Sequence, residues 1–266
     1  MTPEHSESSA NIIHDPANPP VCLVLLGASN LARGWFALTR YMKACLHPRP
    51  VEVLIATGPG RAYRAQGGLL NVVYPPIESS LIFEAAREKS EAGYQLLALV
   101  TDMGNDIMYG VTVDSLIETM EQVFDRLRTL PARIHFTTLP VRFEQGVHPA
   151  WYYFLRSVLL PSSRVSFEEA RQAITRFNGY LRESASVKGH LIPDMDRFLG
   201  YDEIHYGWFQ GRQAWTHVGR CMLEGSGAPT DRTITGPEII RSYWEDIRKI
   251  VATDMAGFKD KHSGHY

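Results

Sequence analysis

Apolar runs that alternate with helical patterns are the feature that most constrains the fold of this chain. Five runs have the length and composition of buried strands: 21–26, 51–57, 96–101, 133–139 and 190–193. Apolar residues recur at helical spacing over six further stretches: 30–46, 78–92, 113–129, 166–187, 208–223 and 236–256. Because parallel strands need crossover connections, this alternation predicts a parallel sheet that helices cover on both faces. Polar side chains that follow the strands would gather at the carboxyl edge of that sheet.

The length of the chain, 266 residues of which 44% are hydrophobic, is sufficient for one substantial domain. Residues 1–20 and 259–266 lack apolar periodicity, so we expect a flexible leader and a disordered tail around an α/β domain at 21–258. This domain includes an added C-terminal helix at 236–256. The apolar residues of that helix predict a stripe facing the core: Ile239, Ile240, Tyr243, Trp244, Ile247, Ile250 and Val251.

The charge and cysteine content argue against several classes of partner. A formal net charge of -2, without a long basic stretch, predicts no nucleic-acid partner. No apolar segment has the length of a membrane span, and residues 1–20 are polar and acidic rather than a cationic signal leader. We therefore expect a soluble, cytoplasmic protein. Cys22, Cys45 and Cys221 are widely spaced without a CxxC pair, which indicates neither a disulfide framework nor a structural zinc site.

A serine follows the first strand-like run. That run ends in Gly27-Ala28-Ser29-Asn30, directly before a helical pattern. The hydroxyl would lie at the amino end of a helix, where main-chain N–H groups and the helix dipole favour developing negative charge. Ser29 is therefore a candidate nucleophile. The alternative is a structural serine that caps the helix.

Three other polar segments follow strand-like runs. An aspartate three residues before a histidine, Asp202 and His205, can hold one imidazole nitrogen and leave the other facing a cleft. The N–H groups of Ser29 and Gly60, with the Asn105 side-chain amide, are donors of the kind that hold an oxyanion. Ser29, Asp202 and His205 are thus the expected catalytic residues. Ser29, Gly60 and Asn105 form the expected oxyanion hole.

These segments, in this order, resemble the four blocks of the SGNH hydrolase family, also called GDSL-like lipases and esterases. The blocks are Gly27-Ala28-Ser29, Gly60, Gly104-Asn105-Asp106 and Asp202-Glu-Ile-His205, and the resemblance spans about residues 21–223. It implies a flavodoxin-like, three-layer α/β/α fold with a five-stranded parallel sheet, and hydrolysis of esters or related acyl groups. It also implies Ser29 as nucleophile, His205 as general base and acid, Asp202 as the orienting carboxylate, and Gly60 and Asn105 as oxyanion donors.

The chain departs from the family pattern at three places. Ala28 stands where the family has an aspartate before the serine, and Met103 stands where the asparagine block has its first glycine. In the glycine block either Gly58 or Gly60 could be the donor. Gly60 is favoured because Pro59, which precedes it, has no N–H.

Substrate contacts are expected from two places. Arg61 and Tyr63 flank the glycine block and could contact an anionic leaving group, although a solvated basic loop is the alternative. The aromatic segment 141–165, which includes Trp151, could form a lid or acyl pocket, a subunit interface in a homo-oligomer, or satellite core packing. The aromatic residues after His205 are expected to pack a helix on the sheet: Trp208, Phe209 and Trp215.

The leading hypothesis is a two-step acyl transfer that cleaves a small-molecule ester through an acyl-enzyme on Ser29, without cofactor or metal. The same site would serve an acyltransferase. A metal-assisted phosphoesterase is a further alternative, with five candidate ligands: Asp102, Asp106, Asp194, Asp196 and His205. Against this alternative, the sequence contains no HExxH motif, no close histidine pair and no phosphate-binding loop. The departures at Ala28 and Met103 motivate a fourth hypothesis, that the chain is a non-catalytic binding protein of the same fold.

Overall fold

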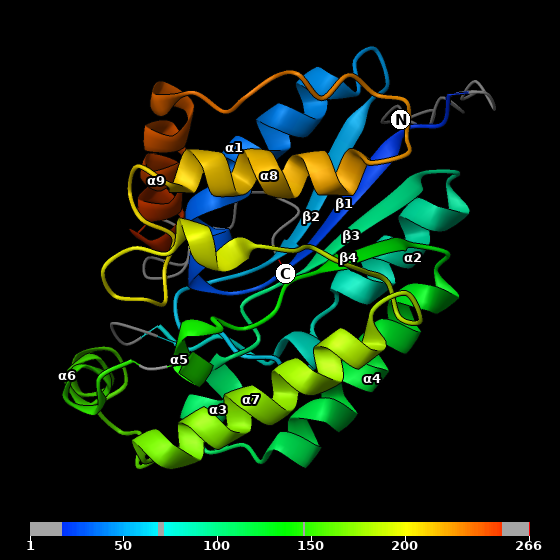
Figure 1. Cartoon of the computed structure of the whole chain (residues 1–266). Coiled ribbons are helices and arrows are strands. Elements are labelled where there is room, and N and C mark those ends of the chain that lie inside the picture. The colour runs from blue at the N-terminus through cyan, green and yellow to red at the C-terminus, as the bar shows by residue number, and fades with distance from the viewer. Residues whose placement is uncertain (1–17, 69–71, 146, 252–265) are drawn as a thin grey trace, which may run out of the picture.

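The computed structural model describes residues 18–68, 72–145, 147–251 and 266, and these form an α/β fold around one sheet (Figure 1). The strands are β1 (Val21–Leu26), β2 (Val51–Ala56), β3 (Gln95–Val100), β4 (Arg133–Phe136) and β5 (His190–Leu191). All neighbouring pairs are parallel, and the strand order is β2-β1-β3-β4-β5. The predicted fold class is confirmed, including the five-stranded parallel sheet.

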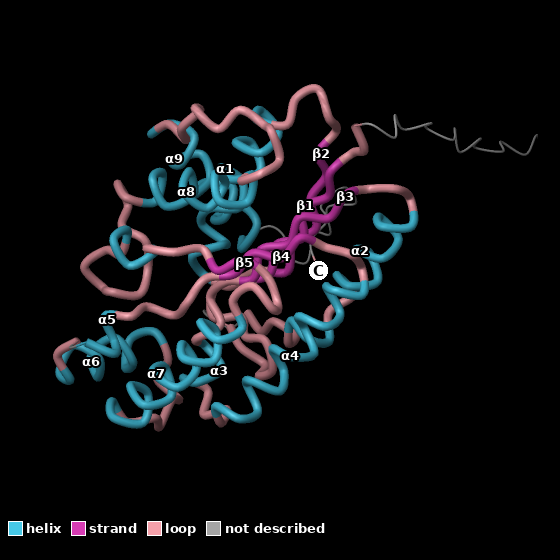
Figure 2. Tube along the Cα trace, turned by 45° about the vertical axis from the view of Figure 1, so that its right-hand side comes forward, coloured by secondary structure: helices cyan, strands magenta, loops and turns pink. Residues whose placement is uncertain are grey.

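Helices cover both faces of this sheet (Figure 2). One face carries α1 (Ser29–Cys45), α8 (Gly211–Leu223) and α9 (Gly236–Lys249), and the other carries α2 (Ile82–Glu91), α4 (Val113–Thr129) and α7 (Phe167–Ser184). The shorter elements are η1 (Ile77–Ser79), α3 (Asn105–Met108), α5 (Arg142–Gln145), α6 (Pro149–Leu159) and η2 (Met195–Phe198). Four of these helical segments lie outside the stretches predicted from the sequence: α3, α5, α6 and η2.

Strand β1 shows why the first apolar run is continuous rather than alternating. Its six residues are all fully buried. Successive side chains point to opposite faces, so Cys22, Val24 and Leu26 join the core under α2 and α4, while Val21, Leu23 and Leu25 join the core under α1 and α8. The strand is therefore held from both sides, and its carboxyl end directs the chain into α1.

Helix α9 corrects the prediction of a core-facing stripe. Ile239 is buried, but Ile240, Trp244 and Ile247 are 57%, 67% and 49% exposed. The helix packs on α1 through a face that includes Ser242, whose hydroxyl oxygen accepts a hydrogen bond from the Ala37 N–H at 3.3 Å. The buried residues of α9 are Ile239, Ser242 and Asp246, so the helix turns a mostly polar face to the protein and its larger apolar residues point outward.

The segment after His205 also differs from expectation in part. Trp215 is buried in α8 as predicted, but Trp208 and Phe209 are 68% and 87% exposed. Both precede the first residue of α8 and so lie outside the packed helix.

The predicted leader and tail lie mostly outside the described residues. The carbonyl of Pro20 already accepts a hydrogen bond from Gln95 N–H, and Tyr266 N–H donates to the carbonyl of Ile55. Among the helices of the described ranges, none combines the length and the apolar character that a bilayer span requires.

Candidate active site

Ser29 is the first residue of α1 and follows β1 after the short turn Gly27-Ala28. Its side chain is partly exposed, and its Oγ lies 2.9 Å from Nε2 of His205. Ala28 occupies the N-cap position of the helix and has no side chain able to cap it. The Ser29 hydroxyl is thus bonded to a histidine from a segment 176 residues away rather than to the helix end, which is the geometry a nucleophile requires.

His205 is held from its other side by Asp202. Nδ1 of the imidazole lies 2.7 Å from Asp202 Oδ2, while the second oxygen accepts the main-chain N–H groups of His205 at 2.8 Å and Ile204 at 3.1 Å. Burial alone would raise the pKa of the Asp202 carboxyl. The hydrogen bond and charge of His205, with these main-chain donors, outweigh burial and lower this pKa to about 2. An ionised Asp202 favours the tautomer with the proton on Nδ1, which leaves Nε2 as an acceptor facing the Ser29 hydroxyl.

A second carboxylate holds the turn that carries Ser29. Asp102, just beyond β3, accepts the main-chain N–H of Ala28 at 3.1 Å and of Leu31 at 2.9 Å on one oxygen. The Thr57 hydroxyl, just beyond β2, donates to the Ala28 carbonyl at 2.8 Å. The ends of β2 and β3, the strands on either side of β1, therefore fix the turn. Asp102 also places negative charge at the amino end of α1, where it is favourable.

The glycine block and the asparagine block are joined to each other. The Asn105 amide donates to the Arg61 carbonyl at 2.8 Å, and the Tyr109 hydroxyl donates to the Gly60 carbonyl at 2.8 Å. Gly60 has a φ of +74°, and a Cβ there would lie 2.7 Å from the Gly68 carbonyl oxygen. Only glycine suits this position, since both the backbone conformation and the space exclude a side chain.

Asp106 fixes the residues that follow Gly60. Its fully buried carboxylate accepts three main-chain N–H groups, from Tyr63 at 2.7 Å and from Arg64 and Ala65 at 2.9 Å. Burial raises the pKa of this carboxyl, against the lowering effect of the three donors. The aspartate of the asparagine block therefore has a structural role, because it holds the main chain of the loop that follows Gly60.

Two expected substrate contacts are not at an accessible surface. Arg61 is buried, and its guanidinium donates to the carbonyls of Pro75 and Tyr266. Tyr63 is fully buried, and its hydroxyl contacts the carbonyls of Leu26 and Thr101 at 3.0 and 2.9 Å. Tyr63 thus bonds the loop to the ends of two strands, and Arg61 bonds it to Pro75 and Tyr266. The structure does not support the expected contact of either side chain with substrate.

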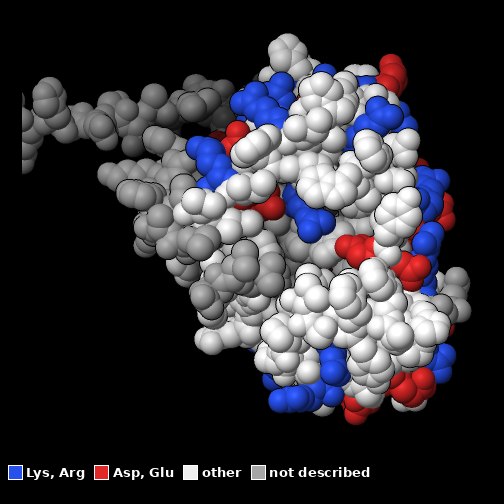
Figure 3. Space-filling view, turned by 90° about the vertical axis from the view of Figure 1, so that its left-hand side faces the viewer, with Lys and Arg blue, Asp and Glu red and all other residues white. Residues whose placement is uncertain are grey.

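Trp151 lies on α6 within the aromatic segment. It is 37% exposed and stacks on Phe154 with ring centroids 5.3 Å apart. Tyr152 and Leu155 on the same helix are buried, and the Tyr152 hydroxyl donates to the Val165 carbonyl at 3.0 Å. One side of α6 is thus satellite core. A lid and a subunit interface stay predictions for the exposed side, which includes Tyr153, Phe154 and Val158. The face in Figure 3 carries an area of uncharged side chains in its lower half, with charged groups around it.

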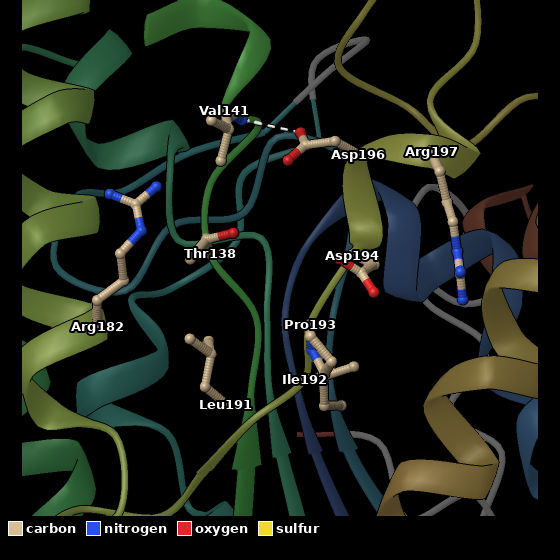
Figure 4. A pocket seen from close by; sticks show the side chains of 9 residues that line it. All are labelled: Thr138, Val141, Arg182, Leu191, Ile192, Pro193, Asp194, Asp196 and Arg197. Carbon is tan, nitrogen blue, oxygen red and sulfur yellow. Dashed lines mark hydrogen bonds between the residues drawn. The ribbon is translucent and has the colours of Figure 1, made fainter.

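The four carboxylates and the imidazole of the metal-assisted alternative do not converge. Asp102 and Asp106 are bonded to main-chain N–H groups, and Asp196 accepts the Val141 N–H at 2.8 Å. Asp194 and Asp196 line a pocket of about 370 Å³ beyond β4 and β5, of which neither Ser29 nor His205 is a lining residue (Figure 4). No group of three or more His, Cys, Asp or Glu side chains within the described residues is arranged to hold a metal ion.

The departures from the family pattern also have structural explanations. The Met103 side chain is fully buried in the core beside α2 and α4, so it points away from the surface on which Ser29 is partly exposed. At Ala28, which carries no carboxylate, the main-chain N–H donates to Asp102 from the loop beyond β3. Sequence reasoning considered Asp102 only as a metal ligand. Its position directly after a buried strand was the available signal.

No family model and no curated protein matches this chain. Solved structures do match it. A protein titled TesA is 16% identical, with 76% of this chain and 98% of that chain covered at a TM-score of 0.47. A member of the lipolytic protein G-D-S-L family from Veillonella parvula is 10% identical, with 77% and 98% covered at 0.43. A GDSL-like lipase from Bacteroides thetaiotaomicron is 8% identical, with 76% and 88% covered at 0.44. Two of these three names contain the family that the four sequence blocks resemble.

Proposed function

We propose that this protein is a serine hydrolase of the SGNH type that cleaves a small-molecule carboxylic ester through an acyl-enzyme on Ser29. One observation carries the proposal: hydrogen bonds of 2.9 and 2.7 Å join Ser29, His205 and Asp202 in a continuous line. A buried core histidine would not need a partly exposed serine at one nitrogen and an ionised carboxylate at the other. This order of groups is that of an activated nucleophile.

The first step forms the acyl-enzyme. Ser29 Oγ attacks the ester carbonyl carbon while its proton passes to Nε2 of His205, and Asp202 stabilises the imidazolium. The tetrahedral intermediate collapses when the bond to the leaving oxygen breaks, and His205 returns the proton to that oxygen. An alcohol departs and the acyl group stays on Ser29.

The oxyanion of this intermediate needs N–H donors that are already oriented. We assign this role to the main-chain N–H groups of Ser29 and Gly60 and to the Asn105 amide. The Asn105 side chain has two N–H groups, and its 2.8 Å bond to the Arg61 carbonyl uses only one and fixes the orientation of the other. The glycine loop cannot move independently because Asp106 and Tyr109 hold it.

In the second step His205 removes a proton from water, which attacks the acyl carbon. The bond from that carbon to Ser29 Oγ then breaks, His205 returns the proton to Oγ, and the acid is released. These residues supply a nucleophile, a base and an anion site, so the proposed reaction uses no cofactor. An acceptor alcohol in place of water would give the acyltransferase alternative at the same site. The cytoplasmic location and the assembly with a second copy stay predictions.

The test is hydrolysis of a short-chain p-nitrophenyl ester by the wild type and Ser29→Ala, each with and without EDTA. We expect activity that is lost in Ser29→Ala, retained in the matched control Ser79→Ala, and unchanged by EDTA. Ser79 is an exposed serine whose hydroxyl donates to the nearby Pro76 carbonyl at 3.2 Å. Activity that survives in Ser29→Ala, or that EDTA removes, would reject the serine mechanism. Inertness toward a broad panel of esters would favour a binding protein.

A further inference from the structure

Asn30 makes an unusual set of contacts for a residue that no step of the proposed reaction uses. It follows Ser29 in sequence and is almost fully buried. Its Oδ1 accepts the main-chain N–H of Tyr206 at 2.9 Å, and its Nδ2 donates to the main-chain carbonyl of Ile204 at 3.2 Å. These two residues flank His205. The side chain next to the candidate nucleophile therefore contacts the backbone on both sides of the candidate base.

The orientation of this amide is fixed by a third hydrogen bond. Nδ2 also donates to Asp102 Oδ1 at 3.1 Å, so both N–H groups and the oxygen of Asn30 are engaged. A flipped amide would place its NH₂ against the Tyr206 N–H and its oxygen against two acceptors. Only one orientation is thus compatible with the surroundings.

Asp102 links Asn30 to the turn that carries Ser29. While one carboxylate oxygen accepts from Asn30, the other accepts from Ala28 and Leu31 on either side of the nucleophile. Asp102 does so with a φ of +56°, a conformation that residues other than glycine seldom adopt. Three segments, the turn before α1, the end of β3 and the loop around His205, are therefore joined at one amide and one carboxylate.

We propose that Asn30, held by Asp102, is a positioning residue that keeps His205 within proton-transfer distance of Ser29. The inference rests on the proposed function. Ser29 begins a helix packed on the sheet, whereas His205 lies in a loop between η2 and α8. Apart from Asn30, the imidazole is positioned by the Asp202 side chain, by hydrogen bonds within the loop and by the packing of Ile204 and Tyr206 on the core. A displacement of about 1 Å between reacting groups is enough to slow catalysis by about 100-fold.

The test measures reaction of Ser29 with a fluorophosphonate, as both the rate and the final fraction labelled, in the wild type, Asn30→Ala and Asn30→Asp. Asn30→Asp is isosteric and keeps an acceptor for Tyr206, but it loses both donors. Asn178→Ala is the matched control, because Asn178 is also buried and contacts the N–H and carbonyl of one residue, Leu139, at 2.8 and 3.2 Å. It contacts neither Ser29 nor His205. Circular dichroism reports whether each variant is folded.

We expect both Asn30 variants to label to completion but about 10- to 100-fold more slowly, with Asn178→Ala labelling at the wild-type rate. Should Asn30→Ala not fold, Asn30→Asp carries the same test. A merely structural role would lower the final fraction labelled and leave the rate of the labelled fraction unchanged, which would overturn the proposal. An equal slowing in Asn178→Ala would also overturn it. A wild type that takes no label at Ser29 would reject the proposed function, and the role of Asn30 with it.

Discussion

The buried histidine of strand β4 makes the stability of this protein depend on pH. His135 is 1% exposed, and it points to the opposite face of the sheet from its neighbours Ile134 and Phe136. Its ring stacks on that of His190 in β5, with centroids 5.3 Å apart. Burial first, and then the positive charges of Arg133 and His190, lower the pKa of His135 from 6.5 to about 4. The imidazole is therefore neutral in the folded chain near neutral pH.

The sign of the effect follows from proton binding. In the unfolded chain His135 titrates near its ordinary value of about 6.5, so between about pH 6.5 and 4 the unfolded state binds more protons. The free energy of unfolding therefore falls as the pH falls through this window. The difference of about 2.5 between the pKa values of the unfolded and folded states corresponds to about 3 kcal/mol of unfolding free energy over the whole window. About 2 kcal/mol of it is lost at about pH 5 relative to about pH 7.5.

Urea unfolding at these two pH values, with the wild type and His135→Leu, measures this contribution. Titration of all other groups is common to both proteins, so we expect the pH-dependent loss to be about 2 kcal/mol smaller in His135→Leu. His190→Gln is the control at an exposed histidine, and most of the loss should remain in it. Equal losses in the wild type and His135→Leu would refute the assignment of this pH dependence to His135.

Three further substitutions test the site. Tyr63→Phe removes a buried hydroxyl that contacts two carbonyls, so we expect the free energy of unfolding in urea titration to fall by about 1–3 kcal/mol. Ester hydrolysis should stay within about twofold of the wild-type rate, and a large loss of turnover would restore Tyr63 as a substrate contact. Gly60→Ala places a Cβ against the Gly68 carbonyl, and we expect at least a tenfold loss of ester hydrolysis, whereas wild-type turnover would remove Gly60 from the oxyanion site. Asp102→Ala leaves the Ala28 and Leu31 N–H groups without their acceptor and should lower the free energy of unfolding by about 2–3 kcal/mol in urea titration; unchanged stability would contradict its role in holding the turn.

The fold could be predicted because periodicity records burial. The continuous apolar run of β1 reflects contact with helices on both faces, and the alternation of strands and helices determines a parallel sheet. The convergence of Ser29 and His205 follows from the same rule, since both segments lie beyond carboxyl ends of strands. Residues distant in sequence were therefore expected at one edge of the sheet before their contacts were known.

Side-chain direction could not be predicted in the same way. Arg61 lies next to Gly60 in sequence, yet its guanidinium donates to the carbonyls of Pro75 and Tyr266. A loop has no repeating backbone geometry, so the direction of one side chain does not follow from that of its neighbour. The stripe on α9 illustrates a related failure: periodicity identifies an apolar side of a helix, but not the side that a neighbour covers. Asn30 was missed because a polar side chain that bonds the main chain of a remote loop leaves no periodic signal.

Mass-spectrometric localisation of a fluorophosphonate adduct, in the wild type and His205→Ala, tests the central claim most directly. Ser29 and His205 are expected to act together, so the wild type should carry one adduct on Ser29. The His205→Ala variant, which keeps Asp202 and should keep the fold, is expected to react far more slowly. An adduct on another residue, or rapid labelling of Ser29 that survives in His205→Ala, would contradict the account.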